Sequence, residues 1–227
     1  MSAIMEKIPF DIVGFDLDGT LLDTSGDLAA AVNHALAMAG RPPFTVEQVK
    51  PMVGGGAKMM LEKGLKASGG MPADEFKPLY RALLSYYEAN IAVHTHPYPG
   101  LLSVLDQFDV WGVKYAIVTN KFESLASKAL GELGLLDRMA TVIGGDTLGA
   151  GNSKPSAAPI HEMISRCGGG RAVFIGDSIF DTMAARNAGI PCVACSFGFL
   201  MHSLDEMNAD AAIDHYDELI GVLRGLG

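Results

Sequence analysis

The sequence predicts an α/β fold, in which a parallel sheet is wrapped by helices and a small helical domain is inserted after the first strand. Three observations predict it. Short apolar runs bounded by Gly or Asp recur along the chain, helical stretches separate them, and one long segment after the first run carries helical patterns alone. Continuous apolar runs are typical of strands buried on both faces, and their alternation with helices favours a parallel sheet.

The predicted strands begin with residues 10–16, an apolar run that ends in Asp16. Further strands are predicted at 113–119, 140–143, 171–177, 190–195 and, more weakly, 211–213. The helices predicted around and between them lie near 100–111, 122–134, 156–166, 179–188 and 215–225. This order is typical of strand–helix–strand units with right-handed crossovers.

Residues 24–95 break this alternation and are predicted as the inserted helical domain. Helical patterns lie near 26–39, 56–67 and 73–91, separated by Pro and Gly, and no convincing strand is present. We therefore divide the chain into a sheet-containing domain, residues 1–23 and 96–227, and a helical domain, residues 24–95.

Composition excludes several classes of protein. The 227 residues are 49% hydrophobic, too apolar for a disordered chain, and 17 basic against 26 acidic residues give a net charge of −9. Nucleic-acid binding is not expected, because it needs a basic surface. No apolar run approaches the roughly 18 residues of a membrane span, and residues 1–10 do not resemble a signal peptide. Three cysteines form no disulfide framework, so a cytoplasmic protein is expected.

Polar residues follow the predicted strands, where open α/β sheets bind their ligands. They are Asp16 and Asp18, Thr119 and Asn120, Lys154, and Asp177, Ser178 and Asp181. Clustered carboxylates repel one another unless a hard cation lies among them, and oxygen ligands suit Mg²⁺. An ammonium with hydroxyl and amide donors suits a phosphoryl group. A carboxylate can attack phosphorus while a second carboxyl group protonates the leaving alcohol, which predicts hydrolysis of a phosphate ester.

The same residues resemble the four motifs of the haloacid dehalogenase superfamily. The motifs are Asp16-x-Asp18-Gly-Thr, Thr119, Lys154 and Gly176-Asp177-x₃-Asp181, and the resemblance covers about residues 10 to 200. Finer features look like the phosphoglycolate phosphatase branch: Tyr98-Pro-Gly-Leu, Val118-Thr-Asn-Lys121, Gly145-Asp-Thr147 and residues 181–189. The resemblance implies a Rossmann-like core that carries an inserted helical cap.

Roles for individual residues follow from this resemblance. Asp16 would be the nucleophile and a Mg²⁺ ligand, and Asp18 the general acid/base that also offers its backbone carbonyl to the metal. Asp177 would complete the protein ligands, with Asp181 behind them or as a further ligand. Thr119 and Lys154 would hold the phosphoryl oxygens, aided by Asn120 and Ser178 as neutral donors. The implied substrate is a small phosphorylated metabolite, with 2-phosphoglycolate first.

Two residues differ from those that other activities of the superfamily require, and they disfavour those activities. Dehalogenases and phosphonatases of the superfamily lack an acid two residues after the nucleophile, so Asp18 is inconsistent with both. Leu28 stands where related mutases carry histidine, which disfavours a mutase. A phosphatase for a sugar phosphate, a nucleotide or pyrophosphate, a phosphomutase, and a phospho-acceptor without turnover stay open as alternatives.

One Gly-rich stretch in the helical domain has two readings. Gly54-Gly-Gly56 precedes Lys58 and matches neither the P-loop nor the dinucleotide-binding pattern. It is either a flexible turn that opens a helix, or a loop whose amides at Gly55 and Gly56, together with Lys58, reach the substrate. Because the chain is acidic overall, Lys154, the metal, and Lys58 or Lys121 must make the pocket attractive to an anion.

Overall fold

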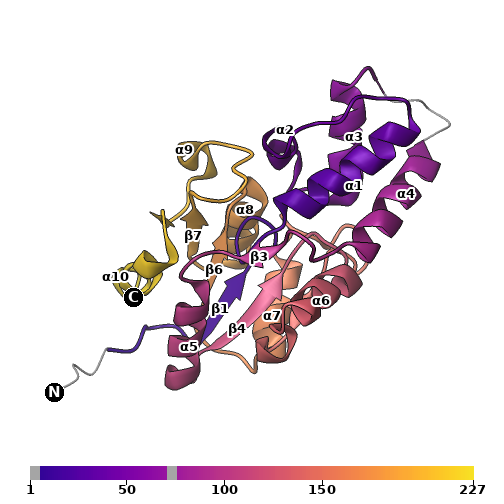
Figure 1. The fold of residues 1–227 in the computed structure, drawn as a ribbon. Helices are drawn as coiled ribbons and strands as arrows, with labels where there is room; N and C mark the ends of the chain where they lie inside the picture. Colours follow the sequence, from indigo (N-terminus) through magenta and orange to yellow (C-terminus); the bar gives the residue numbers. More distant parts are fainter. Residues whose placement is uncertain (1–5, 71–75) are drawn as a thin grey trace.

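The computed structural model describes residues 6–70 and 76–227 and contains a six-stranded, wholly parallel sheet (Figure 1). In space the strands follow the order β5 (Val142–Ile143), β4 (Lys114–Val118), β1 (Ile12–Phe15), β6 (Ala172–Gly176), β7 (Cys192–Cys195) and β8 (Ala211–Ile213). All six lie within the predicted strands, which are confirmed. Because β1 lies between β4 and β6, residues that follow these three strands become neighbours.

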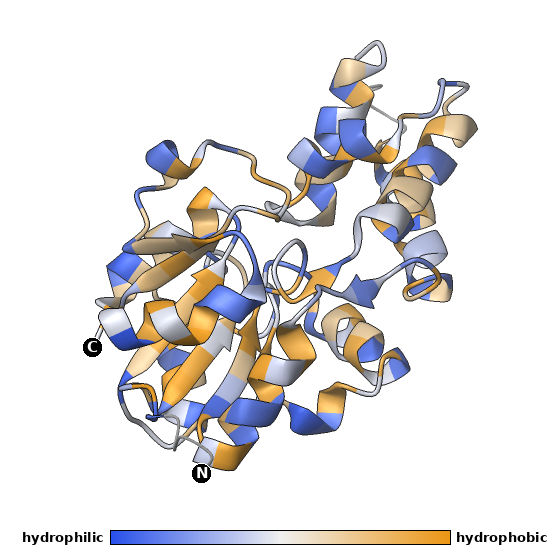
Figure 2. Cartoon of the chain, turned by 60° about the vertical axis from the view of Figure 1, so that its left-hand side comes forward, coloured by the Kyte–Doolittle hydropathy of each residue, from blue (hydrophilic) through white to orange (hydrophobic). Residues whose placement is uncertain are grey.

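Helices cover both faces of the sheet. Val13 and Phe15 of β1 belong to one apolar cluster, together with residues of α5 (Leu101–Trp111), α6 (Glu123–Glu132) and α10 (Leu219–Gly225). Ile12 belongs to a second cluster, with α7 (Ala158–Arg166) and α8 (Ile179–Ala188). Successive side chains of a strand point to opposite faces, so a continuous apolar run supplies both layers. Figure 2 shows the hydrophobic residues gathered along the strands and the covering helices.

A group of helices lies beyond the carboxyl ends of the central strands (Figure 1). It contains α1 (Ser25–Met38), α2 (Val46–Val49), α3 (Gly56–Ala67) and α4 (Phe76–Ala89), with a 3₁₀ turn at Lys50–Met52. Within the described part of residues 24–95 there is no strand, as predicted. Predicted helices 26–39 and 56–67 are confirmed, whereas residues 73–75 of the third prediction lie outside the described residues.

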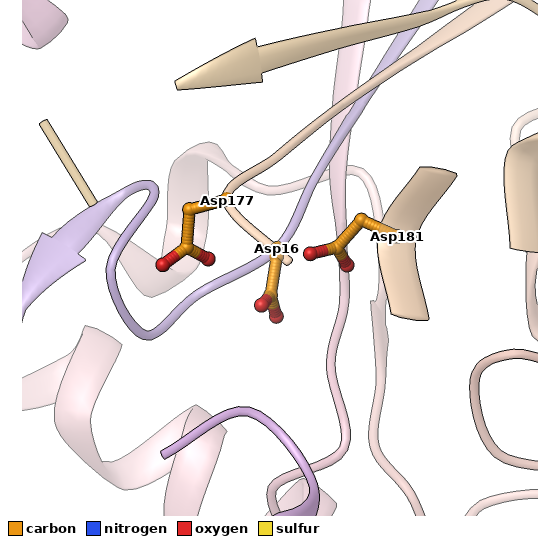
Figure 3. Close-up of side chains that lie close together, drawn as sticks. All are labelled: Asp16, Asp177 and Asp181. Carbon is orange, nitrogen blue, oxygen red and sulfur yellow. The ribbon is translucent and has the colours of Figure 1, made fainter. Parts of the chain in front are cut away.

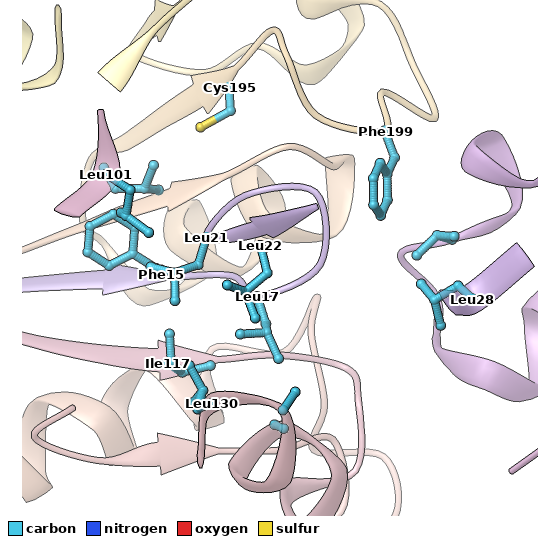
Figure 4. Packing of buried hydrophobic residues seen from close by; sticks show 14 of the residues in the cluster. Phe15, Leu17, Leu21, Leu22, Leu28, Leu101, Ile117, Leu130, Cys195 and Phe199 are labelled. Carbon is cyan, nitrogen blue, oxygen red and sulfur yellow. The ribbon is translucent and has the colours of Figure 1, made fainter. Parts of the chain in front are cut away.

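Two short strands join these helices to the sheet. β2 (Leu22–Asp23) pairs antiparallel with β3 (His96–Pro97), so the chain leaves and re-enters the core at one place. The larger apolar cluster continues through this neck, and Figure 4 shows part of it, from Phe15 in β1 to Leu28 in α1. The helical cap therefore packs against the core through apolar contacts as well as through its two connections.

Several short helices and strands were not predicted from the sequence. The β2–β3 pair, α2 and α9 (Leu204–Met207) were not predicted, because two to four residues are too few to show a period. The predicted helix 215–225 is divided into a 3₁₀ turn at Tyr216–Glu218 and then α10. The remaining core helices keep their predicted places, with ends shifted by up to two residues. No helix in the described ranges has the length and apolar character to cross a bilayer.

Candidate active site

The predicted site residues meet at the carboxyl ends of three adjacent strands. Asp16 follows β1, Thr119 follows β4 and Asp177 follows β6. The register sets Phe15 opposite both Ile117 and Ile175, so the residues just beyond these positions reach the same edge of the sheet. Lys154 arrives from the loop after β5. The convergence expected from the sequence is therefore present.

Three carboxylates form the acidic centre of this edge. Asp16, Asp177 and Asp181 each offer an oxygen within 4.8 Å of the other two, and all three residues are buried (Figure 3). Asp181 comes from the first turn of α8, where it also caps the helix: its Oδ2 accepts hydrogen bonds from the backbone N–H and the hydroxyl of Ser178, at 2.9 and 2.5 Å. The Ser178 hydroxyl, predicted to bind phosphate, is thus engaged with Asp181.

Lys154 supplies the positive charge beside these carboxylates. Its Nζ lies 2.9 Å from Asp16 Oδ1 and 2.6 Å from Asp181 Oδ1, and its side chain is 1% exposed. Burial alone would lower the pKa of Lys154, but Asp16 and Asp181 outweigh it and raise the pKa above its usual range. The ammonium is therefore permanently charged and fixed between the two carboxylates.

The triad carries more negative charge than Lys154 can balance. Burial raises the pKa of Asp16 to about 6, with Lys154 opposing the shift and Asp181 adding to it. The pKa of Asp177 lies well above its usual range because of burial and the neighbouring Asp16 and Asp181. Three buried carboxylate oxygens within 4.8 Å of one another are a set of ligands that fits a hard divalent cation such as Mg²⁺.

Backbone geometry brings Asp177 close to the first loop. Its Oδ2 accepts a 2.6 Å hydrogen bond from Phe199 N–H, and its Oδ1 a 3.2 Å bond from Thr20 Oγ1. Gly19 makes this approach possible, because a Cβ there would lie 2.2 Å from Asp177 Oδ2 and its φ of +81° favours glycine. The turn that separates Asp16 from the cap is thus packed directly on the carboxylate.

Asp18 lies apart from the triad and has its own partners. Its Oδ1 accepts hydrogen bonds from Lys121 Nζ at 2.6 Å and from Thr24 Oγ1 at 2.7 Å. Lys121 Nζ also donates to the hydroxyl of Tyr87 in α4, at 2.7 Å. The sequence suggested Lys121 only as a possible source of charge and missed both Thr24 and Tyr87. Tyr87 follows Leu79 and Leu83 at a four-residue spacing, which is indistinguishable from an ordinary apolar stripe.

Thr119 and Asn120 occupy the end of β4. Thr119 is buried, and its Oγ1 accepts a 3.3 Å hydrogen bond from Lys121 N–H. Asn120 Nδ2 donates to the carbonyls of Gly54 and Lys154, both at 3.2 Å, while its buried Oδ1 has no partner in the described residues. Asn120 therefore joins the Gly-rich stretch of the cap to the loop that carries Lys154.

A cavity of about 200 Å³ lies between the cap and the core. Its polar lining includes Asp16, Asp18, Thr119, Asn120 and Lys121. Its cap side contains the backbone of Gly54–Gly56 together with Lys58, Tyr80 and Tyr87. The Lys58 side chain is 68% exposed and 4.0 Å from Glu62, so it lies at the rim. The Gly-rich stretch thus leads into α3 as a turn and also lines the cavity, so the two interpretations of the sequence are compatible.

Comparisons with known proteins identify the family to which this sequence and fold are similar. The family model described as haloacid dehalogenase-like hydrolase matches residues 13–195. A phosphoglycolate phosphatase of Agrobacterium fabrum is 37% identical over 212 residues, 92% of this chain and 90% of the relative. One from Caulobacter vibrioides is 37% identical over 90% of this chain and 86% of the relative. A crystal structure from Haemophilus somnus 129PT, described as a predicted phosphoglycolate phosphatase, superposes with a TM-score of 0.86 at 26% identity and covers 94% of this chain and 98% of that one.

Proposed function

The chain belongs to the haloacid dehalogenase-like hydrolases, and we propose that it is a Mg²⁺-dependent phosphatase of 2-phosphoglycolate that works through an aspartyl-phosphate on Asp16. The observation that carries the proposal is the placement of Asp16 and Asp18 on one cavity, with Lys154 bonded to the first and Lys121 to the second. A nucleophile and an acid/base, each oriented by its own cation, are what a two-step phosphoryl transfer requires.

Asp16 is oriented for attack on phosphorus. Its Oδ1 accepts a 2.7 Å hydrogen bond from Leu17 N–H and lies 2.9 Å from Lys154 Nζ. Among the described residues no hydrogen bond engages Oδ2, which leaves this oxygen for the new bond. In the first step Asp16 Oδ2 bonds to phosphorus, the ester P–O bond breaks, and the leaving oxygen takes a proton from Asp18.

Asp18 acts in both steps. After it has given its proton to the leaving alcohol, its carboxylate removes a proton from a water molecule. The water oxygen then bonds to phosphorus and the bond between Asp16 and phosphorus breaks, which releases inorganic phosphate and restores both aspartates. Thr119 and Lys154 hold the phosphoryl oxygens. Asn120 supports them through its Nδ2 hydrogen bond to the carbonyl of Lys154, and Ser178 does so by fixing Asp181, which contacts Lys154.

Asp16 and Asp177 would hold Mg²⁺ through their carboxylates and Asp18 through its backbone carbonyl, with Asp181 close by. When bound, the ion neutralises the negative charge that develops on the transferring phosphoryl group. Asp16, Asp177 and Asp181 are all buried, and Asp16 also lines the cavity.

The substrate assignment comes from the relatives and the cap. The relatives from A. fabrum and C. vibrioides are named phosphoglycolate phosphatases, and we carry that substrate over. We assign residues 24–95 as the cap; its Gly55, Gly56 and Lys58 line the cavity, where they would lie around the organic part of the substrate. The described cysteines are all free and buried, in line with a cytoplasmic enzyme.

Phosphate release tests the proposal. The protein is assayed with Mg²⁺ and with EDTA on 2-phosphoglycolate, hexose phosphates, nucleotides and pyrophosphate. Metal-dependent release that is strongest on 2-phosphoglycolate supports mechanism and substrate together. Strongest release on another ester overturns the substrate but keeps the mechanism, and no release on any ester contradicts the enzymatic role.

The intermediate is tested separately with Asp18→Asn. This variant lacks the base of the second step, so a phosphoryl group transferred to Asp16 from an aryl phosphate is expected to persist. Intact-mass measurement after rapid acid quench detects it as the gain of one phosphoryl group. No such gain in Asp18→Asn, with full turnover retained, contradicts the role of Asp18.

A further inference from the structure

The two oxygens of the Asp18 carboxyl group have different surroundings. Oδ1 accepts hydrogen bonds from Lys121 Nζ and Thr24 Oγ1 at 2.6 and 2.7 Å. Within residues 6–70 and 76–227, Oδ2 has no hydrogen-bond partner. Because both donors point at Oδ1, a proton that Asp18 gives and takes would sit on Oδ2, and the position of Oδ2 depends on how firmly Oδ1 is held.

Lys121, the stronger of the two donors, is itself held from the cap. Its Nζ donates to Tyr87 Oη at 2.7 Å and lies 4.6 Å from the centre of the Tyr87 ring. Lys121 is 8% exposed and Tyr87 2% exposed. Burial raises the pKa of Tyr87 to about 12, so the hydroxyl stays a neutral phenol at physiological pH.

The ring of Tyr87, rather than its hydroxyl, packs in the apolar face of α4. The ring continues the buried face of α4 that begins with Leu79 and Leu83, and a phenylalanine ring would fill the same space. The hydroxyl, in contrast, has Lys121 as its partner across the boundary between the cap and the core. A buried polar group retained in an apolar stripe and paired to an active-site cation indicates a role beyond packing.

We propose that Tyr87 is a positioning residue for the acid/base step: from helix α4 of the cap it holds Lys121 against Asp18, so that Oδ2 of Asp18 is directed at the leaving oxygen only while α4 lies on the core. The proposal rests on the proposed function, because it assigns no chemistry except through Asp18. A lysine on a flexible four-carbon stem has three rotatable donors, and the hydroxyl of Tyr87 removes part of that freedom.

Tyr87→Phe tests the proposal, with Tyr86→Phe as its matched control. Tyr86 is the neighbouring residue on α4, its ring stacks on His34, and it does not line the cavity. Each variant is assayed with 2-phosphoglycolate, whose alkoxide leaving group needs a proton, and with p-nitrophenyl phosphate, whose leaving group needs none. Thermal unfolding of each variant is measured in parallel.

In Tyr87→Phe, kcat for 2-phosphoglycolate is expected to fall about tenfold with KM changed less than about twofold. With p-nitrophenyl phosphate the first step is expected to keep its rate while hydrolysis of the intermediate slows. Rapid mixing then gives a burst of nitrophenol, equal in amount to the enzyme, before slow turnover. Tyr86→Phe is expected to match the wild type on both esters.

Three results would overturn the proposal: Tyr87→Phe kinetics equal to those of the wild type, a rise in KM with kcat unchanged, or a burst slowed as much as turnover. The second would place the hydroxyl in substrate binding and the third would indicate a packing defect. If Tyr87→Phe does not fold, Lys121→Met tests the same link from the core side, and the absence of the burst pattern there overturns it equally. Failure of the proposed function is distinct, because the wild type would then hydrolyse neither ester.

Discussion

The two sides of the active site are built from different parts of the chain. The triad side, which consists of Asp16, Asp177, Asp181 and Lys154, comes wholly from loops and a helix of the core. The Asp18 side, which consists of Asp18, Thr24, Lys121 and Tyr87, is completed by residues beyond the neck and in the cap. One side is therefore complete in the core alone, whereas the other depends on where the cap lies.

This difference separates the two tasks of a phosphatase. The phosphoryl group is the same in every substrate, so the groups that bind it can be rigid and buried. The leaving group differs between substrates and must enter and depart, so it is met at a boundary that can open. The inferred link through Tyr87 would let the acid/base group respond to that boundary.

The largest expected effect is at the nucleophile. Asp16→Asn is expected to lower kcat by about 10⁶-fold, as removal of a covalent nucleophile does in other enzymes. Its fold should survive, because Lys154 keeps its 2.6 Å contact with Asp181. Phosphate release and circular dichroism check this, with the exposed Asp205→Asn as control. Activity within tenfold of the wild type would remove Asp16 from the chemistry.

Removal of the triad's cation is expected to cost stability. Lys154→Met leaves Asp16 and Asp181 buried without their ammonium, which should lower the free energy of unfolding by about 3–5 kcal/mol. Urea denaturation without Mg²⁺ measures it. Lys50→Met, which breaks an exposed pair with Glu47, is the control and should change stability by less than about 1 kcal/mol. Equal losses in both variants would contradict the buried role of Lys154.

Metal binding on the triad side should depend on pH. The pKa of Asp16 in the metal-free protein is raised to about 6, so Asp16 is protonated below this pH and Mg²⁺ must displace the proton. The affinity for Mg²⁺ is therefore expected to be about tenfold weaker at pH 5 than at pH 7. Isothermal titration calorimetry at the two pH values measures it. Affinity that stays constant or improves on acidification would contradict displacement of a proton from Asp16 by Mg²⁺.

The smallest effect is expected at the rim of the cap. Lys58 is exposed and distant from the bonds that change, so Lys58→Met should raise KM for 2-phosphoglycolate about threefold and leave kcat within twofold. Lys66→Met, at an exposed position of the same helix that does not line the cavity, is the control. Steady-state kinetics distinguish the two. A fall in kcat in Lys58→Met would extend the catalytic machinery into α3.

Much of this architecture was predictable from residue patterns. Apolar runs located all six strands of the main sheet, because strands buried on both faces leave a strong and local signal. The groups of the triad side were predictable for a related reason: each follows a strand, and parallel strands bring their carboxyl ends to one edge. Short elements such as β2, β3 and α2 were missed because they carry too few residues to show a pattern.

The sequence by itself determined which chemical groups are available and that Asp16, Thr119, Lys154 and Asp177 would converge. Only the tertiary structure decided the partners of Asp18. The contact between Lys121 and Asp18 joins residues 103 positions apart, and that between Lys121 and Tyr87 spans 34 positions. Such contacts depend on how the helical cap packs on the sheet. The sequence pattern predicts that a tyrosine in an apolar stripe is a core residue, and only the structure shows its hydroxyl in contact with a buried lysine.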